Sequence, residues 1–215
     1  RLDDISRSII EQFKKIYDAA DIIFDKRLDK YEVNSDRERN ELDKELELFI
    51  DNDNNKRQSL RENALVDLWY YTERELSRHK YNFNELIMVY SCLAKGNICH
   101  RLSNLFFDDY DLKESDMWGS RANELLWNGK NLIDTLCCNN LAETDEEVLV
   151  LKYLVNENLA KYYRDYASRN RRSDFLSAET IFEEIIKSIN NIKDKKISEK
   201  WKRQFAMLYI EAKRN

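Results

Sequence analysis

Apolar residues recur along this chain at steps of three and four residues, the spacing that places them on one side of an α-helix. Read in this way, the sequence predicts eight helices, over residues 2–32, 35–50, 57–80, 84–106, 113–136, 145–169, 174–192 and from 198 onward. An apolar stripe of this kind has to be covered by another helix. The pattern therefore predicts an all-α fold of about eight helices in stacked antiparallel hairpins, with a compact helical bundle as the alternative.

An acidic loop and an internal glycine predict where one helix begins and where two helices cross. Residues 107–113 are expected to form a loop, and the Asp-Asp-Tyr-Asp run at 108–111 is expected to cap the following helix, because carboxylates are favoured at the positive end of a helix dipole. Gly96 lies inside the predicted fourth helix, where glycine costs about 1 kcal/mol relative to alanine. We therefore expect another helix to cross close to Gly96.

The composition agrees with a helical protein. The 215 residues include no proline and three glycines, so few positions break a helix. Hydrophobic residues make up 42% and charged residues 36% of the chain, as expected for amphipathic helices with solvated outer faces. We expect residues 1–215 to form one repeat-like domain, and the start at Arg1 suggests that this domain is part of a larger chain.

The predicted sixth and seventh helices share a recognisable spacing of small and large residues. Leu159-Ala160-x2-Tyr163 lies in the first of them and Ala178-x3-Phe182-x2-Ile185 in the second. This pair resembles the tetratricopeptide repeat, whose two helices carry Leu-Gly-x2-Tyr and Ala-x3-Phe-x2-Ala. The usual closing proline is missing, and a recurring Leu-Ala-Lys at 93–95 and 159–161 spans more than the family's repeat of about 34 residues. The resemblance implies a degenerate α-solenoid with long helices.

Charge is unevenly distributed along the chain. Residues 151–215 hold 15 basic and 9 acidic residues, a net charge of +6, whereas residues 1–150 hold 21 basic and 32 acidic residues, a net charge of −11. This asymmetry indicates that the two ends face different partners. The basic C-terminal third includes Arg169-Asn170-Arg171-Arg172, a run suited to nucleic-acid phosphates, so an RNA-associated helical module is one functional alternative.

The cysteines and the apolar runs bear on location and cofactors. The four cysteines, at 92, 99, 137 and 138, form no Cys-x2-Cys pair, and the chain has two histidines. We therefore expect reduced thiols in a cytoplasmic protein, with no metal site and no cofactor. No apolar run reaches the roughly 20 residues of a membrane span, so no membrane association is expected.

Two local patterns resemble catalytic motifs. Arg74-x4-His79 has the spacing found in HEPN-type ribonucleases, which implies an acid–base role for His79 and a phosphate contact for Arg74. Glu75 departs from that family, because its charge would repel a phosphate. The acidic run at 108–111 resembles the magnesium motif of class I terpene synthases, but the second motif that those enzymes need is missing.

The leading functional expectation is a protein–protein interaction scaffold or adaptor with no catalytic activity of its own. Its partner would be another protein or another domain of the same chain. The predicted last helix carries large apolar residues and has no following helix to cover them. The contact surface is therefore predicted at Trp201, Phe205 and Tyr209, with the flanking Lys200, Lys202 and Arg203. The alternative is that these three aromatic rings pack inward on the predicted seventh helix. The HEPN-like ribonuclease, with Arg74 and His79, remains an alternative.

Overall fold

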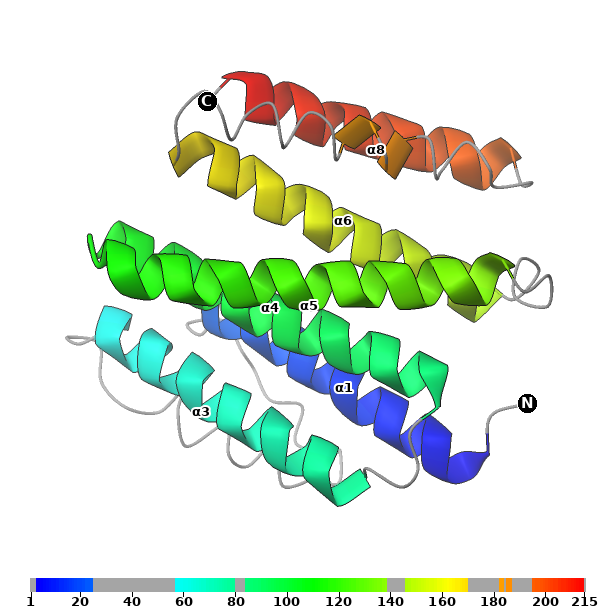
Figure 1. The fold of residues 1–215 in the computed structure, drawn as a ribbon, viewed down its shortest axis with the longest axis horizontal. Helices are drawn as coiled ribbons and strands as arrows, with labels where there is room; N and C mark the ends of the chain where they lie inside the picture. The colour runs from blue at the N-terminus through cyan, green and yellow to red at the C-terminus, as the bar shows by residue number, and fades with distance from the viewer. Residues whose placement is uncertain are drawn as a thin grey trace, which may run out of the picture. The chain divides into compact units, whose positions relative to one another are not determined.

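A computed structural model describes residues 3–24, 57–79, 84–138, 146–169, 182, 183, 185, 186 and 195–214. Within these residues the protein forms six α-helices and no strands (Figure 1): α1 (Asp4–Phe24), α3 (Arg57–His79), α4 (Glu85–Asp108), α5 (Leu112–Cys138), α6 (Glu146–Arg169) and α8 (Lys195–Arg214). The predicted all-α class is confirmed. The predicted second helix lies outside the described residues, as does most of the seventh, of which residues 182, 183, 185 and 186 are helical.

The observed helix ends correct two predictions. Helix α4 continues to Asp108, so the predicted loop at 107–113 shrinks to three residues, 109–111. Helix α8 begins at Lys195, before Ser198. Ser198 is buried inside α8, so it belongs to the packed side of the helix and not to its start.

The helices divide between two compact units. Unit 1 contains residues 1–83 and 94–122, and unit 2 contains residues 84–93 and 123–215. Helices α4 and α5 therefore each contribute one part to unit 1 and the other part to unit 2. The expectation that residues 1–215 make one repeat-like domain stays a prediction.

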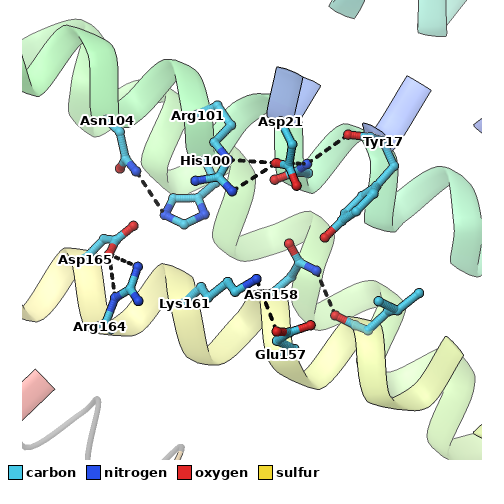
Figure 2. A network of polar contacts seen from close by, with 12 residues as sticks. Tyr17, Asp21, His100, Arg101, Asn104, Glu157, Asn158, Lys161, Arg164 and Asp165 are labelled. Carbon is cyan, nitrogen blue, oxygen red and sulfur yellow. Dashed lines mark hydrogen bonds and ion pairs between the residues drawn. The ribbon is translucent and has the colours of Figure 1, made fainter. Parts of the chain in front are cut away.

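In unit 1, α1 packs against α3 through a continuous apolar side. Ile9, Phe13, Ile16 and Ala20 recur at the predicted spacing and are buried. Polar contacts join α1 to both α3 and α4. The Nε2 of Gln12 donates to Glu75 of α3 at 2.8 Å, and Asp21 receives the Arg101 guanidinium of α4 at 2.9 Å (Figure 2).

The turn between α4 and α5 is closed by backbone hydrogen bonds. The Tyr110 N–H donates to Phe107 O and the Asp111 N–H donates to Phe106 O, the bond pattern of a Schellman C-cap. Tyr110 occupies the left-handed position with a φ of 61°, where glycine is the usual residue. Asp111 also caps α5, because its Oδ1 accepts the Glu114 N–H at 3.2 Å. The predicted capping role is confirmed for Asp111.

In unit 2, helices approach closely at Gly129 of α5, a position that the sequence did not single out. A Cβ atom on Gly129 would lie 3.3 Å from the Cβ of Cys92 and 3.8 Å from a methyl group of Val155. The first distance is tighter than ordinary van der Waals contact, so a larger side chain would overpack this crossing. Gly96, where the crossing was expected, is buried.

Candidate functional site

Helix α8, which carries the predicted contact residues, has one buried side and one exposed side. The Trp201 ring stacks on the Tyr153 ring of α6 with centroids 4.9 Å apart. The Phe205 ring meets the same tyrosine edge-on, with centroids 6.2 Å apart. Trp201 and Phe205 are 6% and 1% exposed, so the expectation that they form an uncovered face is corrected. They are core residues that fix α8 to α6 (Figure 1).

The physical reason for this correction is the helix that covers the stripe. Ser198, Trp201 and Phe205 follow at steps of three and four residues and form one buried side of α8. The leading expectation leaves this stripe uncovered because no predicted helix follows, and its alternative covers the rings with the predicted seventh helix. The structure instead packs Trp201 and Phe205 on Tyr153 of α6. Burial at this packing, with Glu157 as a further contribution, raises the pKa of Tyr153 to about 12.

The other side of α8 is exposed to solvent. Lys196, Lys200 and Arg203 are exposed along it, and Met207 and Ile210 follow with 62% and 46% exposure. We call these five residues the α8 stripe. Of the other predicted contact residues, Lys202 lies beside the stripe and pairs with Glu199 at 3.0 Å, and the Tyr209 side chain is outside the described part of the structure.

The two residues of the ribonuclease-like pattern are separated on α3. Residues five apart on an α-helix point in directions roughly 140° apart. The Arg74 guanidinium lies 5.6 Å from the ring centroid of Tyr71. The His79 Nε2 lies 3.6 Å from the carboxylate of Glu75, which also accepts bonds from Gln12 and Arg78. Glu75 is thus a buried structural acceptor beside His79, and the structure does not bring Arg74 and His79 together.

The acidic run at 108–111 has structural partners in unit 1. Asp111 caps α5, and Asp109 lies beside Glu62 of α3. Burial of the Glu62 carboxyl, together with its hydrogen bond to Asp109 and the nearby negative charge, raises the pKa of Glu62 to about 7 from its ordinary 4.5. Across the described helices, no group of three or more His, Cys, Asp or Glu residues is placed to hold a metal ion.

The raised pKa of Glu62 predicts a pH-dependent stability. The unfolded chain ionises Glu62 near pH 4.5, whereas the folded chain keeps it protonated up to about pH 7, so stability falls as the pH rises between these values. We expect Glu62→Gln to be neutral at pH 4 and stabilising at pH 8. After allowance for partial exposure, the gain should be on the order of 1–2 kcal/mol.

Urea denaturation at the two pH values measures this difference. Glu124→Gln, at an exposed position of α5, is the matched control and should show no such pH-dependent gain. An equal effect of the two substitutions would show that Glu62 is not the source of the pH dependence.

A second ionic cluster, in unit 2, was not predicted. The Asp134 carboxylate of α5 receives Lys130 Nζ at 2.5 Å and Lys152 Nζ of α6 at 3.0 Å. Both lysine side chains are 11% exposed. The four-residue step from Lys130 to Asp134 is a helical ion-pair spacing visible in the sequence. Lys152 could not be assigned to this cluster from sequence, because it comes from another helix.

The cysteines and most of the repeat-like positions lie within the described residues, whereas Ala178 and most of the basic run do not. None of the four cysteines forms a disulfide bond. Burial raises the pKa of the Cys99 thiol well above its usual range. Among the repeat-like positions, Leu159, Ala160, Tyr163, Phe182 and Ile185 are buried. Ala178 and residues 170–172 of the basic run lie outside the described residues.

Comparison with known proteins reveals no relationship for this chain. No protein family, curated protein or solved structure matches the chain. In the portion of the chain that the structure describes, we find no helix with both the length and the apolar character needed to cross a membrane.

Proposed function

We propose that this protein is an interaction scaffold, an array of antiparallel helical hairpins that presents helix faces to a partner protein. The observation that carries the proposal is the two-sided character of α8. One side is fixed to α6 by Trp201 and Phe205, while the other side leaves Met207 and Ile210 exposed three residues apart. Isolated exposed apolar residues are ordinary on a protein surface, but two neighbours on one helix face, flanked by basic residues, form a patch suited to a partner.

The proposed architecture follows the tetratricopeptide-like spacing at 157–192. Its support is the buried state of Leu159, Ala160 and Tyr163 on α6, the positions that small and large residues occupy at helix crossings in such repeats. The Tyr163 hydroxyl donates to Asn123 of α5 at 2.6 Å, and the Trp127 indole N–H donates to the Tyr163 hydroxyl at 3.1 Å. These contacts pair α5 with α6 as an antiparallel hairpin within unit 2. The compact helical bundle remains the alternative architecture.

The scaffold proposal makes a direct prediction about RNA. The purified chain should not cleave single-stranded or structured RNA, and the Arg74→Ala and His79→Ala variants should behave as the wild type does. The physical reason is that Arg74 and His79 point to different sides of α3, and His79 lies beside the Glu75 carboxylate. Gel analysis of labelled RNA, with and without EDTA, measures this. Metal-independent cleavage that is lost in both variants would replace the scaffold with the ribonuclease.

A further inference from the structure

The spacing of the residues in the α8 stripe indicates that a helix would bind there. Its residues, Lys196, Lys200, Arg203, Met207 and Ile210, follow one another at steps of four, three, four and three. This is the a/d spacing of a coiled-coil seam, which repeats every 3.5 residues and keeps one helix in contact with another. The stripe therefore matches a second helix laid along α8.

The chemistry of the stripe changes along its length. Its first three positions are basic, and its last two are apolar and exposed by 62% and 46%. A complementary helix needs acidic residues opposite Lys196, Lys200 and Arg203, and apolar residues opposite Met207 and Ile210. Opposite charges would steer the encounter and fix the register, and the apolar end would supply the buried area.

We propose that the α8 stripe docks an amphipathic helix of a partner protein, with acidic side chains at one end of its seam and leucine-like side chains at the other. This inference rests on the proposed scaffold function and names the chemistry of its partner.

Two other classes of partner fit the stripe less well. A membrane-surface helix places Trp, Phe and Leu on the face that enters the lipid, whereas the aromatic rings Trp201 and Phe205 of α8 are turned onto α6. A nucleic-acid backbone presents phosphates along its whole length, whereas the C-terminal two-fifths of the stripe are apolar. A helix with an acidic end and an apolar end matches both parts.

The test uses the full chain and a fluorescent synthetic peptide with heptad spacing, glutamate at the seam positions of one half and leucine at those of the other. Fluorescence anisotropy should show saturable binding. Lys200→Glu combined with Arg203→Glu should weaken that binding roughly tenfold or more, as should Met207→Ser combined with Ile210→Ser. A second peptide with lysine in place of glutamate should recover binding to the charge-reversed variant alone.

The matched control combines Val150→Ser and Lys113→Glu, because both residues are exposed and lie outside the stripe, Val150 by 47%. This control should bind as the wild type does, and the melting curves of all variants should coincide, since exposed positions contribute little to stability. Absence of saturable binding, equal weakening by the control, or failure of the charge-swapped peptide would each overturn the proposal.

Two further measurements separate the other partners. Binding of anionic phosphatidylserine vesicles or of single-stranded RNA that is lost in the stripe variants, without peptide binding, would assign the stripe to a membrane or to nucleic acid. Failure of the peptide to bind, with no RNA cleavage by the chain, would overturn this inference and leave the scaffold function standing. RNA cleavage that requires Arg74 and His79 would instead overturn the proposed function itself.

Discussion

Replacing Phe205 with alanine is expected to lower the free energy of unfolding by about 3–5 kcal/mol, the range for large aromatic side chains removed from a core. Phe205 is 1% exposed and its ring packs edge-on against Tyr153. The substitution removes the buried ring and leaves a cavity between α6 and α8. Chemical denaturation followed by circular dichroism measures the loss.

Met207→Ala is the control for this substitution, because Met207 lies two residues away on the exposed side of the same helix. Its effect should stay within about 0.5 kcal/mol. Equal losses of unfolding free energy in the two variants would show that the effect is not specific to the buried side of α8. An unchanged unfolding free energy in Phe205→Ala would contradict the packing of α8 on α6.

The second large effect is expected at Asp134. Asp134→Asn keeps the size of the side chain but removes the charge that Lys130 and Lys152 share. Two nearly buried ammonium groups are then left without a carboxylate. Breaking a buried pair in this way costs about 3–5 kcal/mol, and the 30% exposure of Asp134 reduces the expected loss to about 2–4 kcal/mol. Thermal and urea denaturation both measure it.

A rescue experiment separates charge from packing at this cluster. The triple variant Asp134→Leu, Lys130→Met and Lys152→Met replaces all three charges by apolar groups of similar volume, which is often neutral or stabilising. It should therefore recover most of the stability that Asp134→Asn loses. As a control, Glu11→Gln removes the carboxylate from the more exposed ion pair with Lys14 on α1, and should cost less than 1 kcal/mol. Failure of the triple variant to recover stability would show that shape, and not charge, dominates the cluster.

Much of the fold follows from local sequence, because helix spacing and capping are local properties. The periodic stripes predicted the six described helices, and the acidic run at 108–111 was predicted to cap α5, a role that Asp111 fills. The features that the sequence did not predict depend on contacts between residues that are far apart in the sequence. The identity of the helix that covers Trp201 and Phe205, the crossing at Gly129, and the recruitment of Lys152 to Asp134 each require knowledge of which helices pack together.

The same limit applies to the candidate site. Sequence periodicity found the apolar side of α8 but could not say whether another helix covers it, because that depends on which helices pack together. The structure assigns Trp201 and Phe205 to the core and leaves the basic and apolar α8 stripe outside. The basic residues named from sequence, Lys200 and Arg203, belong to this exposed stripe, and their binding of a partner stays a prediction.

The passage of α4 and α5 through both units has a practical consequence for dissecting the protein. Residues 93 and 122, where the chain leaves one unit for the other, lie inside these two helices. A gene fragment that ends at either position would cut a helix and expose residues that are buried in the whole chain, such as Leu93 and Ala122. Neither unit corresponds to one continuous stretch of codons. Expression of one unit alone therefore requires its two segments to be joined by a linker, and a simple truncation does not suffice.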